Sequence, residues 1–75
     1  MTNLPSDIHP LQLIKALNRL GFSEGKAKGS HRRLVHPDGR WTQVAVHPRP
    51  IPKGTLSKIL FQADLKYEDL KKHLK

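Results

Sequence analysis

Apolar residues recur at helical spacing near the start of the chain. The stripe at i, i+3, i+4 and i+7 consists of Leu13, Ala16, Leu17 and Leu20, widened by Ile14. Pro10 suits the first position of a helix, because proline lacks the N–H that would be unpaired there. Gly21 suits the position just past the last turn. The pattern predicts an amphipathic helix that begins at Pro10 and ends before Gly21, preceded by a loose lead-in over residues 1–8.

The middle of the chain changes from helical spacing to alternation. Residues 22–28 predict at most a short or irregular strand, because glycine, alanine and lysine are poor strand formers. Residues 30–36 alternate more regularly. Leu34 shares one face with Ser30 and Arg32, and the other face carries His31, Arg33 and Val35.

A tight turn follows at residues 36–39, which read His-Pro-Asp-Gly. Pro37 and Gly39 fit the second and fourth positions of a type I turn, and Gly39 can take the left-handed conformation that closes a hairpin. The return strand is predicted over about residues 40–47. One of its faces carries Thr42, Val44 and Val46, and the other carries Trp41, Gln43, Ala45 and His47.

The second half predicts two more helices. Three prolines in residues 47–52 make a stiff connector. Gly54 and Thr55 are expected to open a helix, with Thr55 as its N-cap, and its apolar stripe is Leu56, Ile59, Leu60 and Ala63. A short last helix is expected within residues 65–74. We therefore predict an α+β two-layer domain whose core includes Leu17, Leu34, Val44, Ile59 and Leu60, with His31, Arg33, Val35, Trp41 and Gln43 on the open face of the sheet.

Length and charge narrow the functional classes. The chain of 75 residues makes one domain over residues 1–75, and a domain of this size is only marginally stable unless something else stabilises it. With no cysteine, disulfides are excluded, so we expect oligomerisation, such as a homodimer, or capture by a partner. The cysteine count fits a reducing cytoplasm. The net charge of +8 attracts polyanions. No apolar run is long enough to span a bilayer and residues 1–10 lack a signal-peptide pattern, so nucleic acid is favoured over membrane.

The candidate chemistry lies in residues 26–33. This segment carries four cations and no acid, which suits phosphate recognition: Lys26, Lys28, Arg32 and Arg33. Gly29 lets the backbone approach a phosphate closely, and Ser30 adjoins it. His31 sits inside the cluster, and histidine is the usual general acid or base near neutral pH.

RNA can be cut without a metal when a base removes the 2′-OH proton, an acid protonates the leaving 5′ oxygen and cations stabilise the added charge. His31 can supply one proton transfer, and His47 is a candidate for the other because it lies on the same predicted face. Read alone, His31 is more simply an ordinary exposed strand histidine than a catalytic residue. No histidine pair has metal-site spacing, so no metal or other cofactor is expected. A Ser30–His31–Asp38 triad is excluded, because adjacent strand residues point to opposite faces.

At these residues the sequence resembles the HicA (YcfA-like) family of bacterial toxins over about residues 11–74. The anchors are Leu20-Gly21-Phe22, Gly29-Ser30-His31, the hairpin at residues 36–40, then Val44, Val46, His47, Lys53-Gly54-Thr55-Leu56, Ile59-Leu60 and Ala63. The resemblance implies a double-stranded-RNA-binding-domain-like fold, α-β-β-β-α, ribosome-independent mRNA cleavage and neutralisation by a HicB-type antitoxin. The family's functional histidine falls on His31. The sequence departs from the family's pattern in two places. Residues 23–28 contain glycine and alanine, which are poor strand formers, and the first helix has no Ser or Thr cap.

Three hypotheses follow. The first is an mRNA-cleaving toxin of a type II toxin–antitoxin system with His31 as general acid or base. The second is a non-catalytic RNA- or DNA-binding module of the same fold, in which His31 is dispensable. The third is a protein-interaction domain whose basic face docks an acidic partner. A cleavage assay with a His31→Ala control separates the first from the other two.

Overall fold

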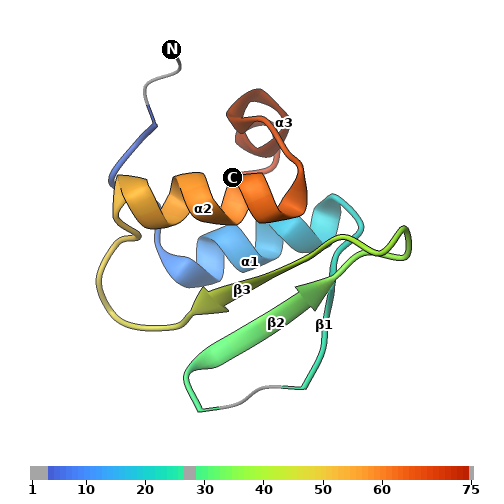
Figure 1. The fold of residues 1–75 in the computed structure, drawn as a ribbon. Helices are drawn as coiled ribbons and strands as arrows, with labels where there is room; N and C mark the ends of the chain where they lie inside the picture. Colours follow the sequence, from blue (N-terminus) through green and yellow to red (C-terminus); the bar gives the residue numbers. More distant parts are fainter. Residues whose placement is uncertain (1–3, 27–28, 75) are drawn as a thin grey trace.

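A computed structural model describes residues 4–26 and 29–74 of the chain. In these ranges the order is α1 (Pro10–Arg19), β1 (Ser23–Glu24), β2 (His31–Val35), β3 (Trp41–Ala45), α2 (Lys53–Ala63) and α3 (Tyr67–Lys71). The strands form one antiparallel sheet, and the helices lie together on one side of it (Figure 1). This confirms the α+β prediction of an α-β-β-β-α two-layer arrangement with a short C-terminal helix.

The sheet has the order β1-β2-β3, so β2 is its central strand. In the β2–β3 pair, His31 lies opposite Ala45, and Val35 lies opposite Trp41. The β1–β2 ladder has two registered pairs, and it continues through Gly25, whose N–H donates to the Arg33 carbonyl at 2.7 Å. The expectation of a short strand in residues 22–28 is confirmed. Lys28 and its neighbour Ala27 lie outside the described residues.

Both ends of α1 follow from the sequence. Pro10 is its first residue. At the other end Gly21 has φ +100°, its N–H donates to the Asn18 carbonyl, and the Phe22 N–H donates to the Leu17 carbonyl. These two bonds form a Schellman motif, which pairs carbonyls that the helix end would leave free. The motif turns the chain so that Phe22, only 2% exposed, enters the core.

The end of the expected lead-in over residues 1–8 is held at Ile8, and residues 1–3 lie outside the described residues. Ile8 is 3% exposed, and its carbonyl accepts a hydrogen bond from the Ile51 N–H at 2.7 Å. Ile51 is itself buried within the proline-rich connector. Neither residue belongs to a helical or alternating pattern, so periodicity did not reveal this contact. The two apolar side chains and the backbone bond anchor the connector next to the beginning of α1.

The helix α2 begins earlier than predicted. Thr55 was expected to be its N-cap, but the helix begins at Lys53, and Pro52 holds the N-cap position with extended backbone. The Pro52 carbonyl accepts the N–H of Leu56 at 2.9 Å, which is the first bond of the helix. Proline at the cap removes one of the N–H donors that would have no partner at the start of the helix, and no side chain caps the first turn. Thr55 therefore lies within the first turn, where its side chain faces outward from the core.

The last helix is shorter than residues 65–74, and α1 holds the segment that follows it. The side-chain amide of Gln12 donates to the Leu74 carbonyl at 2.8 Å. The Arg19 guanidinium donates to the His73 carbonyl at 2.9 Å. Leu70 of α3 is fully buried. The C-terminal segment is thus held to the first helix by two polar contacts, and Leu70 joins the core.

One core lies between the helices and the sheet. All five residues predicted for it are buried, at 0–6% exposure: Leu17, Leu34, Val44, Ile59 and Leu60. The predicted faces of the strands are also confirmed, because Leu34, Thr42 and Val44 are buried while His31, Arg33 and Trp41 are exposed. The helix α2 packs on β3, and α1 packs on β1 and β3. The helices leave the opposite face of the sheet uncovered (Figure 1).

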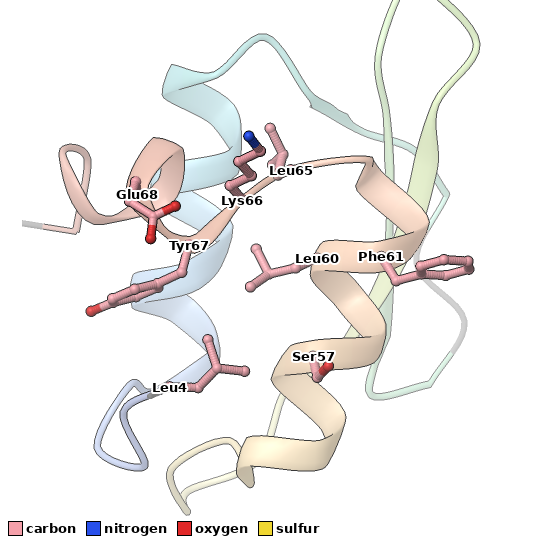
Figure 2. Close-up of a pocket in the computed structure, with 8 residues that line it drawn as sticks. All are labelled: Leu4, Ser57, Leu60, Phe61, Leu65, Lys66, Tyr67 and Glu68. Atoms are coloured by element: carbon pink, nitrogen blue, oxygen red, sulfur yellow. The ribbon is translucent and has the colours of Figure 1, made fainter. Parts of the chain in front are cut away.

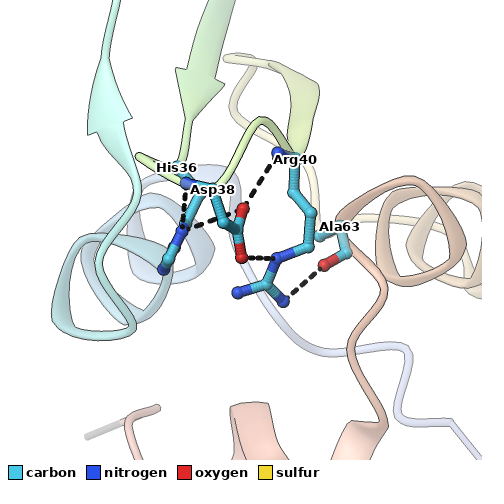
Figure 3. A network of polar contacts seen from close by, with 4 residues as sticks. All are labelled: His36, Asp38, Arg40 and Ala63. Atoms are coloured by element: carbon cyan, nitrogen blue, oxygen red, sulfur yellow. Dashed lines mark hydrogen bonds and ion pairs between the residues drawn. The ribbon is translucent and has the colours of Figure 1, made fainter.

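The hairpin turn is tied to the end of α2 by a polar network (Figure 3). The Arg40 side chain donates to the Asp38 carboxylate at 2.7 Å and to the Ala63 carbonyl at 3.0 Å. The Arg40 backbone N–H donates to Asp38 at 3.0 Å, and this bond is the main reason that the pKa of Asp38 lies below its ordinary value of 3.8. His36, whose ring packs edge-on against Phe22, also contacts Asp38. These contacts fix the turn that joins β2 to β3.

Candidate functional site

The uncovered face of the sheet carries side chains from β2 and β3. His31 and Arg33 alternate along β2, and Trp41 and Gln43 alternate along β3. Arg33 lies directly opposite Gln43 in the register, and its guanidinium lies over the neighbouring Trp41 ring, 4.7 Å from the ring centroid. The strand alternation that buries Leu34 therefore places a histidine, an arginine, an amide and an indole together on the exposed side.

A cleft of about 190 Å³ joins this face to α2. The sheet side of the cleft is formed by His31, Trp41, Gln43 and Ala45. The helix side is formed by Thr55, Lys58, Ile59 and Gln62, which follow one another at i, i+3, i+4 and i+7 and so lie along one stripe of α2. Because β3 is an edge strand and α2 packs on it, the outer flank of the helix lies alongside the edge of the sheet.

The sequence of α2 contains two stripes that lie side by side. The buried stripe is Leu56, Ile59, Leu60 and Ala63, and the cleft stripe shares Ile59 with it. Burial of the first stripe fixes the rotation of the helix about its axis. That rotation directs Lys58 and Gln62 to the cleft. Lys58 precedes Ile59 in the sequence, and Gln62 follows it. The core and the site are thus set by the same helical periodicity.

A buried hydrogen bond orients one of the cleft amides. Thr42 is fully buried on the inner face of β3, and its hydroxyl donates to the Oε1 atom of Gln62 at 2.8 Å. With its oxygen engaged, the half-buried Gln62 keeps its NH₂ group as a donor. The imidazole of His31 and the ammonium of Lys58 have no hydrogen-bond or ion-pair partner within residues 4–26 and 29–74. The cleft therefore brings together donors that are available to a ligand.

The residues before His31 form an exposed turn. Gly29 has φ +63°, a left-handed conformation that glycine adopts readily, and no atom lies near its Cα on the side where a Cβ would project. Ser30 is exposed, and its carbonyl accepts the Val46 N–H at 2.7 Å. Lys26 is exposed beyond β1. Lys28, also expected to bind phosphate, lies outside the described residues.

The predicted cluster of cations is divided between the two faces of the sheet. Arg32 points to the side opposite His31, where its guanidinium pairs with the Glu24 carboxylate at 2.9 Å. Glu24 lies opposite Leu34 in the sheet register, so both partners are on the helix-facing side. Arg33 lies on the same face as His31. The structure therefore brings Arg33, but not Arg32, to the face that carries the histidine.

His47 and His31 line different hollows. His47 lies two residues beyond the end of β3, and its Nδ1 accepts the Arg49 N–H at 3.3 Å. The hollow at His47 is formed by the proline-rich connector, whose other lining residues are Pro48, Arg49, Pro50 and Pro52. The structure does not bring the two histidines into one cleft. In residues 4–26 and 29–74, no group of three His, Cys, Asp or Glu side chains is placed to hold a metal ion.

A wider hollow, lined by polar as well as apolar side chains, lies on another flank of α2 (Figure 2). It is formed by residues of α2, of α3 and of the segment between them, together with Leu4, and Leu60 points into it. Phe61 points away from Leu60 and Tyr67 in this view, and it is 85% exposed. The side chains here do not combine an imidazole with an unpaired cation. We therefore take the cleft at His31 as the candidate functional site.

Lys58, like Gln62, is a cleft residue that sequence reasoning missed. Its signal was present, because Lys58 stands at i+3 from Thr55 and at i−4 from Gln62, next to the apolar stripe of the same helix. The spacing alone does not say which flank of a helix lies against the edge of a sheet. Only the packing of α2 on β3 shows that this flank faces His31.

Comparison with known proteins identifies a family over the part of the chain that forms this cleft. A family model described as the HicA toxin of bacterial toxin–antitoxin systems matches residues 12–65, which contain His31 and the whole of the cleft. A comparison with curated proteins finds no match. None of the helices within the described residues is long and apolar enough to cross a membrane.

Proposed function

Because the chain belongs to the HicA family of bacterial toxins, we propose that it cleaves mRNA as a metal-independent endoribonuclease with His31 as general acid or base. The observation that carries the proposal is the position of His31. Its imidazole lines a solvent-open cleft together with a cation, on the face of the sheet that the helices leave uncovered. A net charge of +8 attracts RNA to the molecule.

The reaction needs only groups of this kind. A base takes the proton of a ribose 2′-OH, and the oxygen attacks the adjacent phosphorus. The bond to the 5′ oxygen breaks, and an acid protonates the leaving oxygen, which yields a 2′,3′-cyclic phosphate and a 5′-OH. The phosphorane that forms on the way carries extra negative charge, which nearby donors stabilise. His31 performs one of the two proton transfers. His47, the candidate that the sequence offers for the other, lines a separate hollow, so a variant tests its part.

Cleavage of a labelled transcript in the presence of EDTA tests this proposal. Wild-type protein should generate fragments that end in a 2′,3′-cyclic phosphate, and His31→Ala should reduce their rate of formation by about 10²- to 10⁴-fold, as is typical for loss of a general acid or base. The His31→Ala protein, purified in parallel, reports contaminating ribonuclease. Equal cleavage by wild type and His31→Ala would exclude His31 from the chemistry.

His47→Ala is the matched histidine variant. If His47 supplies the second proton transfer, its loss should reduce cleavage comparably to the loss of His31. If cleavage by His47→Ala equals that of wild type, the second group lies elsewhere. A transcript with 2′-deoxy sugar at the cut site should resist wild-type protein, because the attacking oxygen is missing.

The uncovered face also favours a second candidate, a non-catalytic nucleic-acid-binding module. The exposed Arg33–Trp41 pair offers both a cation and an aromatic surface, which is how many proteins bind unpaired strands. Salt-dependent RNA binding that survives His31→Ala, with no cleavage by wild type, would support this candidate instead of the ribonuclease.

A toxin of this family is paired with an antitoxin. We propose a HicB-type protein for that role. Expression of the chain alone should arrest bacterial growth, co-expression of a HicB-type antitoxin encoded beside it should restore growth, and His31→Ala should not arrest growth. Growth arrest by His31→Ala equal to that by wild type would separate toxicity from the proposed chemistry.

A further inference from the structure

We infer that α2 supplies the phosphate-binding half of the candidate site, with Lys58 as the direct contact to the RNA phosphodiester and Gln62 as a second donor. This inference rests on the proposed action on RNA. It moves the expected phosphate contact away from the segment around His31 and onto a helix that follows it in the chain by more than twenty residues.

The distribution of cations supports this assignment. Arg32 is paired with Glu24 on the opposite face, and Arg40 is engaged by Asp38 and the end of α2. Arg33 lies over the Trp41 ring and does not line the cleft. Among the residues that the structure describes, Lys58 is the cation that lines the cleft together with His31. A phosphate that reaches His31 in this cleft therefore meets the Lys58 ammonium.

The arrangement around Lys58 suits a phosphate with developing charge. Lysine presents three donors on a flexible stem and is a common phosphate ligand. Gln62 lies one turn further along the same stripe, and the Thr42 hydroxyl holds its oxygen. A held amide offers its NH₂ group without reorganising during the reaction, which is the property that makes fixed donors effective in catalysis. Apolar side chains beside these donors, Ile59 and Ala45, reduce the water that would screen them.

Binding to an uncleavable RNA tests the contact separately from catalysis. An oligonucleotide with 2′-O-methyl groups at every position has no free 2′-OH to attack the phosphorus, so its affinity can be measured at equilibrium over a range of salt concentrations. Lys58→Gln should weaken binding and reduce the slope of log K against log salt by about 1, because one phosphate contact is lost. Lys58→Arg should restore the slope, since arginine keeps the charge.

Lys15→Gln is the matched control. Lys15 is an exposed lysine of α1 that does not line the cleft, and its loss changes the net charge by the same amount. The slope of log K against log salt for Lys15→Gln should stay at the wild-type value. Equal affinities and slopes for Lys58→Gln and Lys15→Gln would overturn the inference, because charge alone would then explain the effect. Circular dichroism of both variants verifies that they are folded.

Cleavage provides the second readout. Lys58→Gln should lower the rate at saturating RNA by roughly 10²- to 10³-fold, the usual effect of removing one donor to a developing oxyanion, while Lys15→Gln leaves it unchanged. If His31→Ala cleaves as well as wild type, the ribonuclease proposal fails, and the salt slope still decides whether Lys58 binds phosphate. If His31 proves essential but Lys58→Gln keeps the wild-type slope and rate, the inference alone fails.

Discussion

The guanidinium of Arg33 lies over the ring of Trp41, 4.7 Å from its centroid, on the uncovered face of the sheet. Trp41 is the only tryptophan of the chain, so its fluorescence reports on this contact. Arg33→Ala should expose more of the ring, shift its emission to longer wavelength and cost roughly 0.5–1 kcal/mol of stability, as for an exposed cation–π pair. His47→Ala, a change outside the contact, should leave the emission unchanged. An identical spectrum for Arg33→Ala would mean that the pair is not formed in solution.

Two leucines of α1 provide a paired test of the core. Leu13 is fully buried, and Leu11 is 55% exposed. Both are Leu→Ala changes in the same helix and alter helix propensity equally. The difference between their free energies of unfolding therefore reports the effect of burial. We expect Leu13→Ala to lower the free energy of unfolding by about 2–5 kcal/mol and Leu11→Ala to change it by no more than about 0.5 kcal/mol. Urea denaturation measures both. Similar losses for the two variants would show that α1 is rotated from its described orientation.

The end of α1 depends on a glycine that faces a histidine. A Cβ atom at Gly21 would lie 2.8 Å from the Nε2 atom of His36, and the backbone there has φ +100°. Gly39 has the same φ but open space around it. Gly39→Ala should therefore cost about 1–2 kcal/mol through backbone strain alone, and Gly21→Ala should cost more. Adding His36→Ala should reduce the extra loss of stability caused by Gly21→Ala. It should not reduce the loss caused by Gly39→Ala. An additive double variant would exclude the clash.

Asp38 gives the hairpin turn a defined pH dependence. The hydrogen bond from the Arg40 N–H lowers the pKa of Asp38 in the folded protein below the ordinary value of 3.8. The folded state then binds this proton less readily than the unfolded chain does. The carboxylate's contribution to stability is therefore complete above the unfolded pKa and is lost as the pH falls through the folded pKa. Unfolding curves of wild type and Asp38→Asn should differ near neutral pH and converge in acid. Curves separated by a constant amount at every pH would contradict this.

Much of the fold follows from local signals in the sequence. Pro10 and Gly21 mark the ends of α1 because proline lacks the N–H that would be unpaired at the start of a helix, and glycine readily takes the positive φ found just past its end. Gly39 marks the hairpin because it adopts a conformation that other residues avoid. Alternation around Leu34 and Val44 distinguishes the two faces of the sheet. The beginning of α2 was misplaced because Gly54 and Thr55 resemble a cap, whereas Pro52 holds that position without any side-chain bond.

The site was less predictable than the fold, because it joins segments that are distant in the chain. His31 and its face could be found from alternation and from the family resemblance. Arg32 shows the limit of counting charges, since it belongs to the basic segment yet pairs with Glu24 on the other side. Lys58 could not be assigned, because its role depends on which strand α2 packs against. The contact of Ile8 with Ile51 could not be predicted either, because it joins two segments that are distant in the chain.

Ile59 belongs both to the core and to the cleft. A larger enzyme can separate a rigid scaffold from the side chains that contact its ligand, but this domain uses one side chain for both. Repacking beneath α2 would turn or shift the helix, and Lys58 would move with it. Selection for a tighter core and selection for a particular substrate therefore act on the same residue, and each constrains the other.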